Sequence, residues 1–319
     1  MASVDAVDFA IYRYLSPDGA ARFWGSRRVY DPRIGAREIA ARIGLSETGV
    51  RARLRSLRER GYRRDSVVWP NPGLFDVSLH VAEIPVSEVG ASRTLLRDLS
   101  LADGVTFARD VLDEEDRKLQ VYFVGEGPSE IQRRAALIRR LAGARDVRGP
   151  HPYFVPEPSA RLSSLDWKIV AGLRAAPEES LQQLGRRLGL SLKTTSRRYR
   201  ALIDSRAVWW SQGPTSEELP LALLTVGVDA EVDAEQVAVR VAEETDAWMP
   251  VAADGRGISP SSRAVDFAGL LLADSPAGVE SIGQSLLDRA GVTTVRRTFA
   301  LGSAIYPGWF DAQIARRQR

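Results

Sequence analysis

Cysteine is absent from the 319 residues of this sequence, and histidine occurs only at His80 and His151. Without thiols the chain cannot form disulfides, use a thiolate nucleophile or build a cysteine-type zinc site. Carboxylates with only two imidazoles rarely make a transition-metal site, so we expect no bound metal. Neither histidine needs a catalytic explanation, and we expect no catalytic residue. We also expect no cofactor, because the glycines of segments 124–130 and 254–259 lack the lysine and the spacing of a phosphate-binding loop.

Long apolar runs are missing as well. No segment reaches the roughly 18 consecutive apolar residues of a membrane-spanning helix, and the N-terminus has no basic stretch followed by an apolar run. These absences predict a cytoplasmic protein that does not enter a membrane. Hydrophobic residues make up 44% of the chain and charged residues 27%, which is typical of a globular protein. The length suits about two to four compact units.

A strong excess of charge of one sign is also missing, because the formal net charge is only +3. The charge is nevertheless unevenly placed along the chain. Residues 26–64 contain 12 arginines against 4 acidic residues, and residues 161–206 contain 10 basic against 4 acidic residues. The segments that follow them, 65–160 and 207–319, are net acidic. Two short basic blocks, each followed by a longer acidic block, indicate an internal duplication.

The duplication is visible in the alignment of the two copies. VDFAIYRYL (7–15) recurs as LDWKIVAGL (165–173), with apolar residues on one helical face, and segments 36–62 and 181–207 align without a gap. In each copy an amphipathic helix meets a glycine, Gly44 or Gly189, that can end it, and a serine two residues later can cap the next helix. Three helices with a tight turn between the second and third predict a helix-turn-helix head in each copy.

Alternating strand-like and helix-like segments follow each head. In copy one we expect strands at 74–84, 105–112, 119–125 and ending near 155, and helices at 91–99 and 129–142. In copy two we expect strands at 221–229, 249–253, 265–273 and 292–301, and helices at 235–244 and 278–290. This βαββαβ order predicts a ferredoxin-like domain and an α+β fold class. The predicted domains are winged helix-turn-helix units at 1–70 and 158–215 and ferredoxin-like units at 71–157 and 216–319.

The first head resembles the leucine-responsive and asparagine-synthesis regulator family (Lrp/AsnC) at its signature positions, which are Asp8, Gly44-Leu45-Ser46, Val50, Arg53-Leu54, Leu57 and Gly61. Copy two keeps Asp166, Gly189-Leu190-Ser191, Arg198 and Leu202, with Thr195 in place of the Val and Arg206 in place of the Gly. The resemblance implies a DNA-binding transcription regulator whose ferredoxin-like domains dimerise and often sense a small molecule. It thus implies double-stranded DNA and a small-molecule effector as partners, and leaves homo-oligomerisation through the ferredoxin-like domains open. Two modules in one chain imply an intramolecular pseudo-dimer.

Two segments depart from the family pattern. Copy one inserts ARFWGSRRVYDPR (21–33) between its first two helices, and its aromatic and arginine side chains suit either a DNA grip or an extra packing hairpin. The family's Gly-x-x-Asp signature between the middle strands is not intact in either copy, where 113–117 and 254–263 stand instead. This departure weighs against an amino-acid effector. The acidic run 113–116 could bind a cation, but a solvated turn is the simpler interpretation.

The third helix of each head carries the candidate DNA contacts. Apolar side chains at i, i+4 and i+7 bury one face and turn the opposite face outward. The candidates are Ser46, Thr48, Arg51, Arg55 and Arg58 in copy one and Lys193, Ser196, Arg197 and Arg200 in copy two. Guanidinium groups there can read guanine O6 and N7 or grip phosphates. Arg53 and Arg198, at equivalent flanking positions, are expected at the DNA backbone or in a structural ion pair.

The same helices also predict the form of the operator, the DNA site that the protein would bind. Because the two exposed faces differ in sequence, we expect an imperfect palindrome or an asymmetric site, with half-sites about one helical turn apart.

Two other functions remain open. Siroheme decarboxylases resemble the same combination of folds and can occur as fused pairs, but they depend on His and Arg residues around a buried tetrapyrrole. Copy two has no histidine, and no Arg-His-Arg stretch follows the wing, so we expect that the chain is not an enzyme. The other alternative is a winged-helix module that binds a protein, and the two basic heads weigh against it without excluding an acidic partner.

Overall fold

A computed structural model describes residues 5, 7–8, 10–11, 35–60, 66–86, 89–114, 116–144, 146–153, 155, 157–211, 221–229, 248–252, 267–272 and 275–318. The insertion 21–33, Gly61, the expected helix at 235–244 and the segment 254–263 lie outside these residues. In the described part of the chain, no helix combines the length and the apolar character needed to cross a membrane.

Copy one contains the expected ferredoxin-like sheet. Its strands are β2 (Ser78–Pro85), β3 (Val105–Leu112), β4 (Arg117–Gly125) and β5 (Arg148–Tyr153), antiparallel and in the order β5-β2-β4-β3. The helices α5 (Val89–Asp98) and α6 (Gly127–Ala142) cover one face, where apolar residues alternate along the strands and meet the helices in one core. A short helical turn, η2 (Leu99–Leu101), follows α5. The strand order confirms the βαββαβ prediction.

Copy two repeats this strand order. The strands β7 (Leu221–Val228), β8 (Trp248–Ala252), β9 (Phe267–Leu272) and β10 (Val292–Ile305) stand in the order β10-β7-β9-β8. The helix α11 (Pro276–Leu287) packs against this sheet through Val279 and Leu286, which meet Leu224 and Val295 in a small apolar core. The two copies are therefore alike in strand order as well as in sequence.

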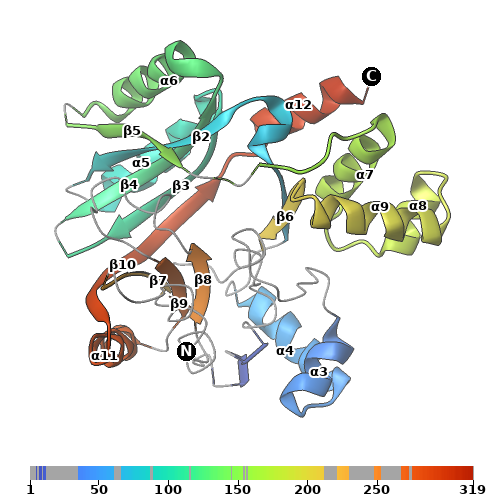
Figure 1. The fold of residues 1–319 in the computed structure, drawn as a ribbon, viewed down its shortest axis with the longest axis horizontal. Coiled ribbons are helices and arrows are strands. Elements are labelled where there is room, and N and C mark those ends of the chain that lie inside the picture. Colours follow the sequence, from blue (N-terminus) through green and yellow to red (C-terminus); the bar gives the residue numbers. More distant parts are fainter. Residues whose placement is uncertain are drawn as a thin grey trace.

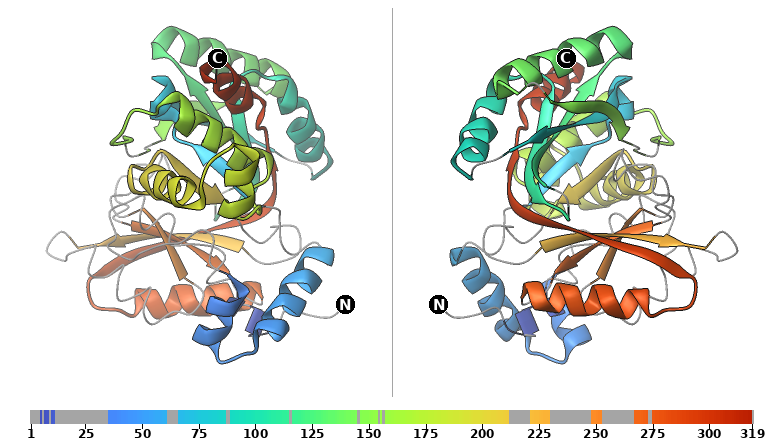
Figure 2. Two further views of the ribbon diagram at one scale, coloured as in Figure 1. Left: turned by 90° about the vertical axis from the view of Figure 1, so that its right-hand side faces the viewer. Right: turned by 90° about the vertical axis from the view of Figure 1, so that its left-hand side faces the viewer.

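The strand β10 joins the two sheets into one. Its first part, residues 292–300, pairs with β7 of its own copy, and its second part, residues 299–305, pairs with β3 of copy one. In Figure 2 this long red strand runs through both halves of the molecule. The result is a continuous eight-stranded sheet within one chain.

The heads also contact each other through the strands that follow them. The first head contains α3 (Ala36–Ile43) and α4 (Glu47–Glu59), and the second contains α7 (Ser164–Ala175), α8 (Leu181–Arg187) and α9 (Leu192–Asp204). After them come β1 (Val67–Pro70) and β6 (Val208–Ser211), which pair with each other antiparallel. In Figure 1 both heads lie on the same side of the molecule.

The C-terminal helix α12 (Gly308–Arg317) is an element that the sequence patterns did not predict. It packs beside α7, and Phe310 and Ile314 join Phe75 and Trp167 in a core cluster that also contains side chains of β1, β6 and α9. Phe75 ends the short turn η1 (Pro72–Phe75) after β1. An ion pair of 2.6 Å between Arg174 of α7 and Asp311 adds to this contact. The second head is thereby fixed to the start of the first ferredoxin-like domain.

Candidate nucleic-acid interface

Each third helix begins at a serine cap that follows a left-handed glycine. Gly44 (φ 72°) ends α3 and Gly189 (φ 70°) lies in the turn after α8, a backbone conformation that glycine adopts without steric cost. The Oγ of Ser46 then accepts a hydrogen bond of 3.0 Å from the amide of Gly49, and Ser191 does the same for Thr194 at 3.2 Å. The predicted turn chemistry is thus present in both heads. The hydroxyl of Ser46, a candidate DNA contact, caps α4.

The flanking arginines form equivalent structural ion pairs in the two heads. Arg53 Nη1 lies 2.8 Å from the carboxylate of the buried Asp8, and Arg198 Nη1 lies 3.2 Å from that of Asp166. Each pair ties the third helix to the first helix of its own head. Arg53 also bonds Asp5, and this hydrogen bond is the main reason why the pKa of Asp5 lies below its usual value. The structural-pair alternative for Arg53 and Arg198 is confirmed.

The candidate residues of copy one differ in what they contact. Thr48, Arg51 and Arg55 are exposed on α4. Arg51 forms an ion pair of 2.6 Å with Glu47, one helical turn earlier. Arg58 points to the second head instead, where it lies 2.6 Å from the carboxylate of Glu178 between α7 and α8. Arg58 thus contributes a contact between the two heads.

The candidate residues of copy two make fewer contacts within the protein. Lys193, Arg197 and Arg200 are exposed along α9, and none of the three makes an ion pair or a side-chain hydrogen bond within the described part of the chain. Ser196 is half-buried beside them. The outward face of α9 therefore presents three uncompensated cations.

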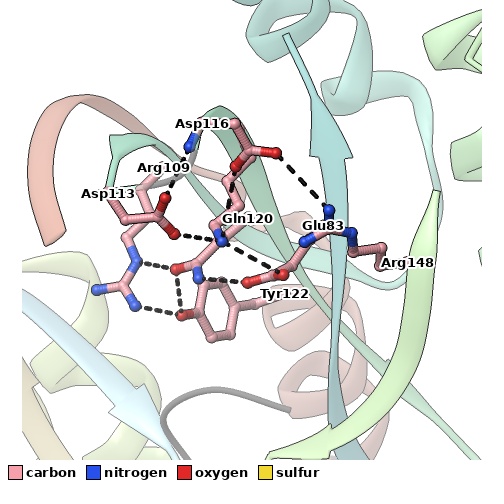
Figure 3. Close-up of polar contacts among 8 residues, drawn as sticks. Glu83, Arg109, Asp113, Asp116, Gln120, Tyr122 and Arg148 are labelled. Carbon is pink, nitrogen blue, oxygen red and sulfur yellow. Dashed lines mark hydrogen bonds and ion pairs between the residues drawn. The ribbon is translucent and has the colours of Figure 1, made fainter. Parts of the chain in front are cut away.

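A second polar site lies on the face of the copy-one sheet that α5 and α6 do not cover (Figure 3). Arg109 of β3 donates to the side-chain oxygen of Gln120 at 2.7 Å and to the hydroxyl of Tyr122 at 2.6 Å. Gln120 in turn donates to Glu83 of β2 at 2.8 Å. Glu83, Gln120 and Tyr122 are all buried, and burial is the main cause that raises the pKa of Tyr122 above its usual value.

Lys118 extends this cluster toward the turn after β3. Its Nζ lies 2.5 Å from Asp113 and 3.7 Å from Glu83, and its side chain is buried. Burial by itself would lower the pKa of Lys118, but the hydrogen bond to Asp113 and the negative charges of Glu83 and Asp116 raise it above the usual value. Asp113 and Asp116 of the acidic run thus form ion pairs with Lys118, which the interpretation as a solvated turn did not include. Within the described residues, no group of histidines or carboxylates is arranged to hold a metal ion.

The sequence patterns did not predict this cluster. Along β4, Leu119, Val121 and Phe123 alternate with Lys118, Gln120 and Tyr122. Such alternation usually marks a sheet with one solvated face, whereas here both faces are buried.

Comparison with protein families identifies both heads. A model for winged helix-turn-helix DNA-binding matches residues 29–62, and a model for the AsnC-type helix-turn-helix domain matches residues 162–203. No curated protein matches the sequence.

Several solved structures resemble this one at low sequence identity. The siroheme decarboxylase NirDL is 12% identical, with 94% of this chain and 97% of that chain covered and a TM-score of 0.49. A transcriptional regulator of Neisseria meningitidis in complex with L-Met is 17% identical, over 43% of this chain and 88% of its own, with a TM-score of 0.32. AsnC of E. coli is 10% identical, over 44% and 92%, with a TM-score of 0.31.

The match to NirDL contradicts the expectation that the chain is not an enzyme. An enzyme matches this chain over nearly the full length of both, so the scarcity of histidine does not justify that exclusion. The heads and the strand order of the sheets, in contrast, are as predicted from the sequence. The chain contains two helix-turn-helix DNA-binding segments, the second of AsnC type, each followed by a ferredoxin-like domain.

Proposed function

We propose that this protein is a sequence-specific transcription regulator of Lrp/AsnC type, in which the two heads of one chain act as a pseudo-dimer on double-stranded DNA. The main support is that the outward faces of α4 and α9 carry exposed basic side chains, while Arg53 and Arg198 face inward in structural pairs. Basic side chains at these positions of a third helix can reach base edges and phosphates in the major groove. A regulator of this kind would act in the cytoplasm.

We divide the chain into heads at 1–70 and 158–215 and ferredoxin-like units at 71–157 and 216–319. A small-molecule effector, and any assembly into homo-oligomers, would involve the ferredoxin-like units. The nine candidate contacts remain part of the proposal, with Ser46 acting through the helix cap and Arg58 through the contact with Glu178.

Binding to genomic DNA fragments across a salt series tests this function. The wild type is compared with Arg51→Ala/Arg55→Ala and Arg197→Ala/Arg200→Ala. A matched control is Arg139→Ala/Arg140→Ala, which removes two exposed arginines of α6, away from the heads. We expect affinity that falls steeply with salt, loss of sequence preference in both head variants and no change in the control. If the protein does not bind DNA, or if the control variant loses as much binding as the head variants, the proposed function as a regulator is wrong.

A second candidate is a tetrapyrrole enzyme like the siroheme decarboxylases. The observation that favours it is the polar cluster on the copy-one sheet, because it places the half-buried Arg109 and the buried Lys118 on one face, where such cations can bind the carboxylates of a ligand. Titration of iron-uroporphyrin with the protein, followed by visible absorbance, tests it. A saturable spectral shift that Arg109→Gln weakens would support the enzyme, and an unchanged spectrum would reject it.

A further inference from the structure

The two recognition helices differ in charge at aligned positions. Position by position, Glu47, Thr48 and Ala52 of α4 correspond to Leu192, Lys193 and Arg197 of α9. Arg55 and Arg200 are the one pair of exposed cations that both helices share. The first turn of α4 thus starts with an acid, whereas that of α9 starts with an exposed leucine and a lysine.

Ion pairs within the protein increase this difference. In the first head, Glu47 holds Arg51 at 2.6 Å and Glu178 holds Arg58 at 2.6 Å, which leaves Arg55 as the one exposed cation of α4 without a partner among the described residues. In the second head, Lys193, Arg197 and Arg200 all remain without one.

Phosphate contacts require cations that are not already neutralised. Each cation that neutralises a phosphate releases about 0.9 counterion from B-DNA, so the salt dependence of binding counts such cations. If Arg51 turned to DNA, Glu47 would remain as an unpaired negative charge at the DNA-facing start of the helix, and the net gain would be small.

We propose, building on the proposed function, that the two heads bind DNA unequally. Among the described residues, the third helix α9 of the second head supplies more phosphate contacts than α4, whose contribution is reduced by Glu47. The partner is therefore an asymmetric duplex with one dominant half-site.

Fluorescence anisotropy with a bound operator fragment tests this proposal through the slope of log K against log salt concentration. The variants are Arg197→Gln/Arg200→Gln and Arg51→Gln/Arg55→Gln, which remove two arginines from each helix, with Arg139→Gln/Arg140→Gln of α6 as the control. The slope should fall by about 1.8 in the α9 variant and by about 0.9 in the α4 variant, because Arg51 is already neutralised.

Glu47→Gln is the complementary variant, since it should free Arg51. We expect its slope to rise by about 0.9 and its affinity to increase at low salt. If the slope falls equally in the two double variants, or if Glu47→Gln leaves it unchanged, the proposal that the heads bind DNA unequally is wrong. The proposed function as a transcription regulator would not be affected by that result. No DNA binding by the wild type would instead reject the proposed function itself.

Discussion

At the scale of single residues, the second head differs from the family signature at the end of its third helix. The signature has glycine there, and this chain has Arg206, whose backbone is left-handed (φ 59°). The side chain of Asn71 donates to the carbonyl of Arg206 at 2.9 Å, and the amide of Asn71 donates to Ala207. These bonds between the second head and Asn71, which directly follows β1, hold a conformation that costs a non-glycine residue about 1–2 kcal/mol.

We therefore expect Arg206→Gly to stabilise the protein. The gain should be about 0.5–1 kcal/mol, because the greater freedom of glycine in the unfolded chain offsets part of the relieved strain. The measurement is the free energy of unfolding in urea. Arg197→Gly, within α9, is the control and should lose about 1 kcal/mol. A destabilised Arg206→Gly would mean that the side chain of Arg206 contributes more than its exposed position indicates.

Lys118 gives a second prediction at this scale. Lys118→Met removes the cation that Glu83 and Asp113 face in the interior, and should cost about 3–5 kcal/mol in the free energy of unfolding at neutral pH. Lys168→Met, which removes an exposed lysine of α7, is the control and should cost far less. An equal loss in both variants would show that the polar cluster contributes no more than a surface lysine.

The pH dependence of the same variant follows from the pKa of Lys118, which is raised above its ordinary value of 10.5. A raised pKa means that the folded state holds the proton of Lys118 more tightly than the unfolded state does. The resulting stabilisation of the folded state is complete below the unfolded pKa and is lost as the pH rises through the folded pKa. The stability gap between wild type and Lys118→Met should thus narrow above about pH 10.5. Urea unfolding at several alkaline pH values measures it, and a gap that widens would contradict the assignment.

At the scale of elements, α12 shows how the second head is held. Phe310 is buried against Trp69 and Phe75, with ring centroids 6.0 and 5.8 Å away, and belongs to the cluster that includes α7 and α9. Phe310→Ala should lower the free energy of unfolding by about 3–5 kcal/mol, since it empties a packed site. Arg316→Ala, on the exposed side of α12, should change it by less than about 0.5 kcal/mol. A similarly small effect of Phe310→Ala would show that α12 does not hold the second head.

Elements with a clear local signature could be predicted, and those defined by distant contacts could not. The strand-like segments at 105–112 and 221–229 match β3 and β7 closely, because both are short runs rich in apolar residues. The helix at 165–173 matches α7 closely, because its apolar residues repeat at the spacing of one helical face. The polar cluster and the junction of β10 with β3 escaped prediction, because both arise where segments far apart in the sequence meet. The glycine–serine turns of the heads could be predicted because they depend on neighbouring residues. The ion pair of Arg58 could not, because its partner Glu178 lies 120 residues away in the sequence.

At the scale of the whole molecule, the pairing of the two copies within the chain decides how many chains a DNA site needs. β10 pairs with β3, and β1 pairs with β6, so each copy already contacts the other through its sheet and through the strand after its head. Both heads lie on one side of the molecule (Figure 1). A single chain thus carries the third helices of both helix-turn-helix heads, and under the proposed function these are the two helices that contact DNA.

We therefore expect one chain per operator duplex. Light scattering after size exclusion should give the complex the mass of the duplex plus 35.0 kDa, and binding at low protein concentration should follow a one-site isotherm. The control is a duplex that keeps only the stronger half-site. It should bind one chain more weakly, because the weaker head then meets only nonspecific DNA. A complex with two chains and a cooperative isotherm would show that the heads of separate chains pair on DNA, despite the sheet that joins the copies within each chain.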